Sequence, residues 1–306
     1  MKTTKKFQIL ESNHIYNSWQ ILDHTGTRCT SSLRTHKQRS ILDDLHEKRV
    51  YEKAGHPFDI ISITGKRYKN LPVHEAIPKS FSDEVCKALQ EENPVLIPHG
   101  YCAYAPAVVG GMQRAYGPQA RIGVIWIDAH YDNVILEHTK EFPATFVSIP
   151  LSAICGCTMQ DWCRDSCGMK TWIPGERILA ADGRLSDEEA EQNKEIMQIH
   201  SVNAKQFEDS EIWQKAIDQI SMQTDFLYVM IDADILAEEY VPGYYESEPG
   251  GHSLHRVVQN LKDVLQTGKV KVLSCFCFDF DKYEQGGDVN SLSEIKIIET
   301  AFKNWK

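Results

Sequence analysis

The stretch Phe226-Leu-Tyr-Val-Met-Ile-Asp-Ala-Asp234 decides the fold, because a run of six apolar residues stops at two aspartates spaced two positions apart. Two further apolar runs have the same form: 122–127 stops at Asp128, and 270–278 stops at Asp279. Uninterrupted apolar runs of this length are typical of strands buried on both faces, as in a parallel sheet. A shorter run at 94–98 predicts another buried strand.

Helical patterns lie between and after these runs, at 104–116, 187–198, 211–222, 252–266 and 291–302. Strands that alternate with helices indicate an α/β fold with a parallel sheet. Residues 1–90 are harder to read and predict two strands, 16–22 and 58–64, with charged, helical sequence between them. Because the sequence shows no repeat, low-complexity stretch or linker, we expect one domain over residues 1–306.

The overall composition excludes some classes of protein. The chain has 306 residues, 42% hydrophobic and 25% charged, with a formal net charge of -10. Without a basic block it does not have the footprint of a nucleic-acid-binding protein, and a small cationic ligand is a better electrostatic match. It also lacks a long apolar stretch for a membrane span and an apolar signal-peptide core, so we expect a cytoplasmic protein with no membrane partner.

Acidic residues follow two of the predicted strands as Asp128-Ala-His130-Tyr-Asp132 and Asp232-Ala-Asp234. In open α/β sheets the ligand site lies outside the carboxyl ends of the strands, where these side chains would meet. If the first segment remains extended, its three polar side chains share one side. A lone Asp-x-Asp is more often a turn, but two clusters that each follow a buried strand favour a metal site.

Four carboxylates gathered in a medium of low dielectric constant would repel one another and take up protons unless cations were present. Two divalent ions would balance their charge. Oxygen and imidazole ligands suit Mn²⁺, and they can also hold Fe²⁺, Ni²⁺, Co²⁺ or Zn²⁺.

These two clusters resemble the motifs of the ureohydrolase superfamily, which contains arginases and agmatinases. Residues 125–132 resemble its WxDAHxD motif, and 231–251 resemble its second metal motif, including Val241-Pro-Gly243 and Glu248-Pro-Gly-Gly251. The resemblance covers roughly residues 94–300. It implies a three-layer α/β/α fold with a mostly parallel sheet of about eight strands. It also implies a binuclear manganese centre, bridged by a hydroxide that attacks a guanidinium carbon.

The resemblance also implies which residues bind the metals, namely Asp128, His130, Asp132, Asp232 and Asp234. The family's remaining ligand is a histidine, and the matching stretch His99-Gly-Tyr-Cys-Ala103 places Cys102 there. A thiolate adds a negative charge and shifts the preference towards softer ions such as Zn²⁺, Co²⁺ or Fe²⁺.

Several positions depart from the family pattern. Asp279 falls where the family's glutamate binds the substrate guanidinium, with Asp281 the alternative in a shifted register. The family's proton-shuttling histidine is missing from the matching segment 147–150, and His138 nearby is either a substitute or a surface-loop residue. Large residues replace the family's small ones at the mouth of the site, which indicates a remodelled pocket or loop packing: Tyr240, Tyr244, Tyr245 and Glu246. These departures predict a variant member that is not an ordinary arginase.

The resemblance therefore implies hydrolysis of a C–N bond in a small guanidino compound, with release of urea. Asp128 or Asp234 would act as general base and then acid, and Asp279 would pair with the guanidinium. By analogy with the family we expect a homo-oligomer. Two alternatives remain open: another amide or formimino hydrolase, like a formiminoglutamase or a deacetylase, and a non-catalytic relative that binds metal or ligand.

Most of the nine cysteines are expected to be reduced thiols. A dense group, Cys155-x-Cys157-x₅-Cys163-x₃-Cys167, is either a structural zinc site or a set of core and loop thiols. We favour thiols because the spacing matches no common zinc motif. Cys275 and Cys277 alternate along a predicted strand and are interpreted as core or near-site residues.

Overall fold

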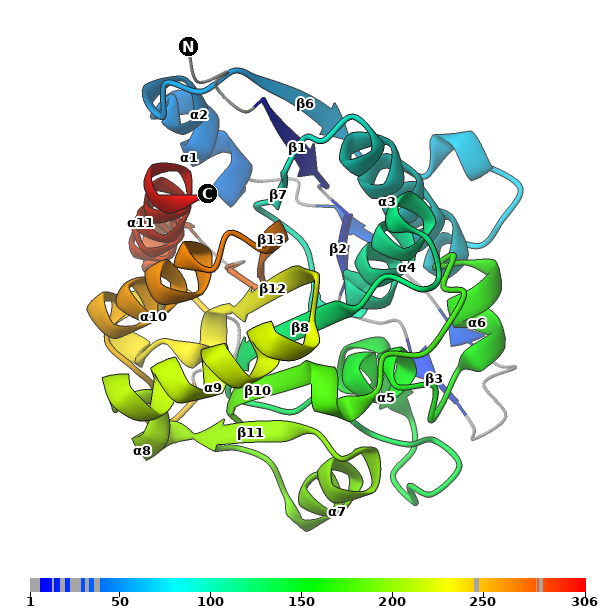
Figure 1. Cartoon of the computed structure of the whole chain (residues 1–306). Coiled ribbons are helices and arrows are strands. Elements are labelled where there is room, and N and C mark those ends of the chain that lie inside the picture. The colour runs from blue at the N-terminus through cyan, green and yellow to red at the C-terminus, as the bar shows by residue number, and fades with distance from the viewer. Residues whose placement is uncertain are drawn as a thin grey trace.

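The computed structural model describes residues 6–12, 14–16, 20–22, 29–30, 33–35, 39–244, 248–278, 280 and 283–306. Its centre is an eight-stranded sheet in which every pairing of neighbours is parallel (Figure 1). In order across the sheet the strands are β11 (His200–Asn203), β10 (Ile178–Asp182), β8 (Ile122–Asp128), β12 (Phe226–Asp232), β13 (Val270–Phe276), β7 (Val95–Ile97), β1 (Phe7–Glu11) and β6 (Phe58–Ser62). The expected three-layer α/β/α fold is confirmed.

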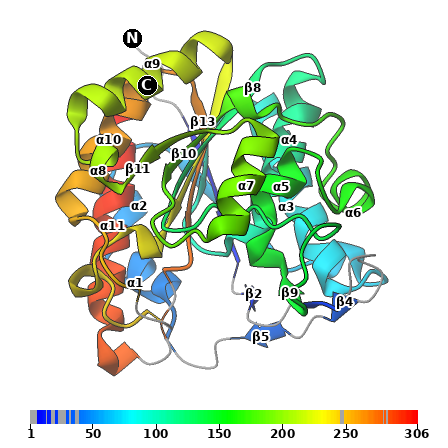
Figure 2. The same cartoon turned by 90° about the horizontal axis from the view of Figure 1, so that it is seen from below.

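Helices cover both faces of this sheet, as the view along its edge shows (Figure 2). One face carries α1 (Ile41–Glu47), α9 (Ser210–Gln223), α10 (Leu254–Gln266) and α11 (Gly287–Asn304). The other carries α3 (Val73–Gln90), α4 (Ala105–Tyr116) and α5 (Pro150–Ile154). The shorter or more peripheral helices are α2 (Val50–Lys53), α6 (Gln160–Asp165), α7 (Glu188–Met197) and α8 (Ala204–Phe207).

Short antiparallel strands lie beside the main sheet. The strand β2 (His14–Tyr16) pairs with β5 (Leu33–Thr35), and β3 (Gln20–Ile21) lies between β4 (Cys29–Thr30) and β9 (Ala144–Thr145). The single strand predicted at 16–22 is therefore divided between β2 and β3, and its middle, residues 17–19, lies outside the described residues.

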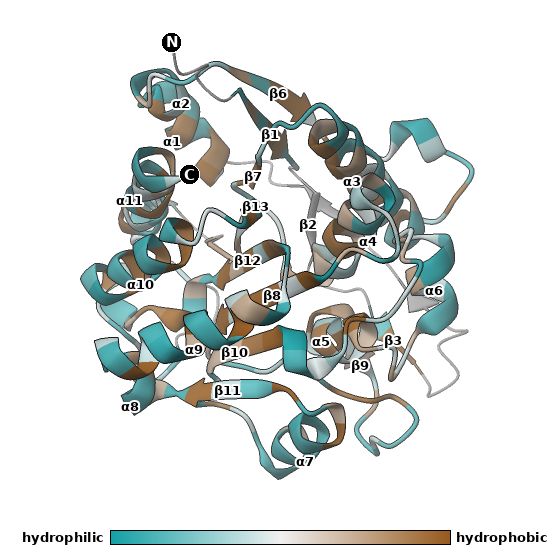
Figure 3. Cartoon of the chain, in the orientation of Figure 1, coloured by the Kyte–Doolittle hydropathy of each residue, from teal (hydrophilic) through white to brown (hydrophobic). Residues whose placement is uncertain are grey.

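The pattern of apolar residues explains the layers. All seven residues of β8 are buried, as expected for a strand with helices on both sides. The helices show apolar residues towards the sheet and polar residues outward (Figure 3). Side-chain oxygens of Asp187, Asp209 and Ser253 accept hydrogen bonds from backbone N–H groups in the first turns of α7, α9 and α10, which fixes where these helices begin.

The strands β6, β7, β8, β12 and β13 and the five predicted helices form close to their predicted bounds. Sequence reasoning missed β1, β10, β11 and the long helix α3. Among the described helices, none combines the length and the apolar character needed to cross a membrane.

The register of the sheet brings the acidic strand ends together. Asp182 pairs in register with Asp128, and Asp232 with Phe276, so the carboxyl ends of β10, β8, β12 and β13 finish at nearly the same level. Three of these four strands end in an aspartate, and the fourth is followed directly by Cys277.

Candidate metal centre

The first group of donor atoms at this edge consists of Asp128, His130 and Asp234, whose ligand atoms all lie within 4.8 Å of one another. The Nδ1 of His130 is 2.9 Å from Asp234 Oδ2 and 3.6 Å from Asp128 Oδ1. Backbone amides orient both carboxylates: His130 N–H donates to Asp128 over 2.6 Å, and Ala129 N–H donates to Asp234 over 3.0 Å. Each aspartate therefore keeps a second oxygen or lone pair for a cation.

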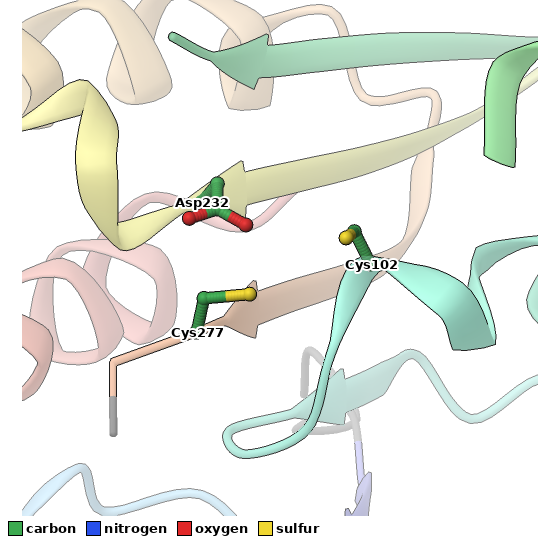
Figure 4. Close-up of side chains that lie close together, drawn as sticks. All are labelled: Cys102, Asp232 and Cys277. Atoms are coloured by element: carbon green, nitrogen blue, oxygen red, sulfur yellow. The ribbon is translucent and has the colours of Figure 1, made fainter. Parts of the chain in front are cut away.

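The second group consists of Cys102, Asp232 and Cys277, again with ligand atoms within 4.8 Å of one another (Figure 4). Cys102 begins the 3-10 helix η2 (Cys102–Tyr104), Asp232 ends β12, and Cys277 follows β13. All three side chains are buried. Cys277 was not predicted as a ligand.

Asp132 belongs to neither group, although it was predicted to stand with Asp128 and His130. The segment does not stay extended, because Asp132 has a φ of 46° and the chain turns away from the strand direction after Asp128. The alternation that would place all three side chains on one side is therefore lost. Asp132 and the Cys102 thiol nevertheless influence each other's pKa, so Asp132 borders the second group.

Burial dominates the electrostatics of the carboxylates. It raises the pKa of Asp128 well above its usual value, reinforced by Asp234 and Asp132, and it raises the pKa of Asp232 likewise, reinforced by Cys277 and Asp234. The pKa of Asp132 rises to about 7, again mainly through burial. Such carboxylates stay ionised at neutral pH only beside positive charge, so the donor set fits divalent cations.

The pKa of His130 also reflects the negative charge of the neighbouring aspartates. Burial lowers its pKa, but hydrogen bonds to Asp128 and Asp234 outweigh burial and raise the pKa to about 12. The two aspartates therefore favour positive charge at this position. A divalent ion would supply that charge and leave a neutral imidazole as ligand.

A network centred on Arg184 supports the loop that carries Asp234. Its guanidinium donates to the Asp234 carbonyl over 2.6 Å and to the Pro249 carbonyl over 2.9 Å, and it pairs with the buried Asp182. His252 lies 3.3 Å from Asp182 through Nε2, and its Nδ1 is 2.5 Å from Glu208. These contacts join the ends of β10 and β12 to the 248–252 loop.

An acidic hollow of about 390 Å³ lies between the segments 237–242 and 248–250, and Glu248 connects it to the first donor group. Glu238, Glu239 and Glu248 line it, and Glu248 Oε1 is 4.0 Å from His130 Nε2. Burial raises the pKa of the Tyr244 hydroxyl well above the usual value, and the charges of Asp232, Cys277, Asp234 and Asp128 reinforce this. Tyr244, one of the large residues predicted at the mouth of the site, therefore lies near the donor groups. Tyr240, another of these residues, is half-buried.

Other predicted positions lie elsewhere. Asp279, Asp281, Tyr245 and Glu246 lie outside the described residues. His138 is exposed on a loop, as the surface-loop alternative required. The thiols at 155, 157, 163 and 167 do not form a donor group among the described residues; Cys163 and Cys167 are buried, and Cys155 and Cys157 are half-buried.

The parallel sheet with acidic donor groups at its carboxyl edge defines an α/β protein with a candidate metal centre. The family model described as the arginase family matches residues 28–276, and the chain belongs to this family. The ureohydrolase resemblance is confirmed.

Individual relatives agree with the family. A curated arginase from Entamoeba histolytica is 26% identical over 208 residues, which is 67% of each chain. The crystal structure of Entamoeba histolytica arginase with L-ornithine superposes with a TM-score of 0.75 at 16% identity, covering 98% of this chain and 99% of that one. Formimidoylglutamase from Bacillus subtilis gives a TM-score of 0.66 at 14% identity over 99% and 88% of the two chains. The two structural matches show the shared fold.

Proposed function

We propose that this arginase-family hydrolase cleaves a C–N bond of a small guanidino compound and releases urea. The observation that carries this proposal is the acidic hollow that Glu248 and two further glutamates line, because Glu248 also lies 4.0 Å from His130 of the first donor group. Such a hollow favours a cationic substrate, and a guanidinium is a planar cation that pairs well with carboxylates.

The two donor groups would hold two divalent ions, with Mn²⁺ the first choice for the group of Asp128, His130 and Asp234 because its donors are oxygen and imidazole nitrogen. The ions, when bound, supply an activated water and polarise the carbon under attack. The backbone amides of Ala129 and His130 hold the carboxylates of Asp234 and Asp128 in fixed orientations.

The proton transfers are assigned to side chains of the first donor group. Asp128 or Asp234 accepts the proton that the water loses and returns it to the leaving nitrogen, and the remaining proton of the attacking hydroxyl follows, so that the guanidinium cation and water give urea and a protonated amine. Glu248 pairs with the cationic substrate from the side of the hollow. Asp279, which the family pattern aligns with a guanidinium-binding position, remains the proposed second carboxylate for this cation.

A substrate screen with defined metal content tests the proposal. The chain loaded with Mn²⁺ is incubated with arginine, agmatine, guanidinobutyrate, hydroxyarginine and guanidine, and urea is measured. We expect urea from at least one compound, and a rate at least about 1000-fold lower for Asp128→Asn at an unchanged fold, because the variant loses one ligand and one candidate base.

The same screen separates the alternatives. Turnover of formiminoglutamate or of an N-acetylated amine without urea release would contradict the proposed reaction and assign another amide-type hydrolase. Full metal loading without turnover of any of these compounds would instead identify a non-catalytic relative.

A further inference from the structure

We propose that Cys102, Cys277 and Asp232 hold a zinc ion through two thiolates and one carboxylate, so that the two metal subsites of this chain take different metals. This inference deepens the proposed function and rests on it for the existence of a binuclear centre. Its readouts are metal content and spectra, so it can fail while urea release succeeds, and the reverse.

The topology of the sheet supplies the three donors from three adjacent strands. The strands β12, β13 and β7 are neighbours, and each is followed at its carboxyl end by one donor residue or ends in it. Asp232 pairs in register with Phe276, the residue before Cys277. Asp232 and Cys277 are thus placed by the ends of two sheet strands, and Cys102 is placed by the 3-10 helix that follows β7.

Backbone contacts fix the two cysteines relative to each other. The N–H of Cys277 donates to the carbonyl of Gly100 over 2.9 Å, which joins the chain after β13 to the turn that leads to Cys102. Cys277 has a φ of 61°, an unfavourable value for a residue with a side chain. In this conformation the Cys277 side chain leaves the alternation of β13 and points to Cys102 and Asp232 (Figure 4).

The distances and burial fit a small tetrahedral ion. The three ligand atoms lie within 4.8 Å of one another, and the residues are 3%, 3% and 6% exposed for Cys102, Asp232 and Cys277. A zinc ion with Zn–S bonds of about 2.3 Å needs ligand atoms roughly 3.5 to 3.8 Å apart. Side-chain rotations that move the ligand atoms by about 1 Å would bring them to this spacing. The thiol of Cys102 gives up its 3.6 Å contact with the Val147 carbonyl when it loses its proton.

The chemistry of the donors distinguishes this subsite from its neighbour. Two sulfurs and one oxygen favour Zn²⁺ strongly over Mn²⁺, whereas Asp128, His130 and Asp234 offer oxygen and nitrogen. Three protein ligands also leave a fourth position open, which is typical of catalytic rather than structural zinc sites. Three negative ligands reduce the Lewis acidity of the zinc, so its role is to bind and orient more than to activate.

Cys275 provides a matched control for Cys277. It lies two residues earlier in β13, is fully buried, and is next to Glu294 rather than in either donor group. Cys275→Ser therefore makes the same chemical change two residues earlier in the chain without replacing a proposed ligand.

The test measures zinc by elemental analysis after the reduced protein is dialysed against excess Mn²⁺, and it records absorption after substitution with Co²⁺. We expect about one zinc per chain to remain, and an intense sulfur-to-cobalt charge-transfer band. Cys277→Ser and Cys102→Ser should each weaken zinc binding by about 100-fold or more and reduce the band, while Cys275→Ser leaves both unchanged.

A measurement on the unmutated protein tests the same inference without depending on whether the variants fold. X-ray absorption at the zinc edge of the unmutated protein should show two sulfur neighbours at about 2.3 Å. One sulfur neighbour or none, replacement of all zinc by Mn²⁺, or an unchanged cobalt band in a folded Cys277→Ser variant would each overturn the inference.

Discussion

Glu248 lies between His130 and the acidic hollow, and its substitution tests how the substrate cation is bound. Glu248→Gln keeps the shape and removes the charge. We expect KM for the best guanidino substrate to rise about tenfold, which corresponds to roughly 1.4 kcal/mol, with a smaller change in kcat. Steady-state kinetics measure both constants.

Glu239 is the matched control for this change, because it lines the same hollow and belongs to neither donor group. Glu239→Gln should raise KM much less. A fall in kcat at constant KM for Glu248→Gln would show that Glu248 acts in the chemical step and would contradict its assignment to substrate binding.

His252 gives the stability of the protein a specific pH dependence. Burial lowers its pKa, but the carboxylates of Asp182 and Glu208 outweigh burial and raise the pKa above the ordinary value of 6.5. The ion pairs therefore stabilise the fold fully below about pH 6.5, and this contribution is lost as the pH rises through the folded-state pKa.

The free energy of unfolding in urea, measured from about pH 5.5 to about pH 9, checks this expectation. His252→Gln should destabilise the protein most at the acidic end, and the difference from the wild type should shrink towards alkaline pH. Arg256 also pairs with Glu208, so Arg256→Gln serves as a comparison in which no histidine titrates. A His252→Gln effect that is constant with pH would contradict the assignment.

Some residues of the candidate metal centre could be predicted from the sequence and others could not. Asp128, His130, Asp232 and Asp234 could be selected because each follows an apolar strand, and the structure brings them to one edge. Cys277 could not, since a strand pattern gives no sign that the backbone enters the left-handed region and redirects the side chain.

At the scale of elements, the loop after β10 links the carboxyl ends of β10 and β12, on either side of β8. Arg184→Met would leave the buried Asp182 without its guanidinium partner and release the carbonyls of Asp234 and Pro249. Breaking a buried ion pair on one side costs about 3–5 kcal/mol, so we expect a loss of about 3 kcal/mol in the free energy of unfolding, with weaker metal binding. Urea unfolding and elemental analysis measure the two effects.

An exposed ion pair calibrates the Arg184 experiment. Arg121 pairs with Asp225 at the surface, with side chains 53% and 40% exposed, so Arg121→Met should cost no more than about 1 kcal/mol. Equal costs for the two substitutions would show that the Arg184 network contributes no more than a surface pair.

The missed elements share physical features. The residues of β10, Ile-Leu-Ala-Ala-Asp, and of β11, His-Ser-Val-Asn, form strands through their neighbours and have little strand propensity of their own. The strand β1 carries buried Gln8 and Glu11. These polar residues interrupt the apolar run that would otherwise predict a strand inside the sheet. Such strands are specified by tertiary pairing, which local patterns do not report.

At the scale of the whole molecule, all eight parallel strands share one sheet, and we propose that the chain is a single domain with the metals at its common edge. Removing the metals should therefore destabilise the entire chain. A chelator should lower the melting temperature by about 5–10 °C, since a ligand at a hundred times its dissociation constant contributes about 2.7 kcal/mol.

Calorimetry with and without chelator, followed by restoration with metal, measures this effect. A single transition that shifts and recovers fits the single domain. Asp128→Asn should respond less to the chelator because it has lost a ligand. An unchanged melting temperature after complete metal loss would contradict a structural contribution from the centre.

The position of β13 between β12 and β7 has a consequence for the order of assembly. Its neighbours lie far apart along the chain, so the sheet is completed only when a late segment inserts between two earlier ones. During synthesis, a nascent polypeptide that stops before residue 270 has neither this strand nor Cys277. Metal loading through the sulfur pair is thus a late event, which follows the synthesis of the complete first donor group.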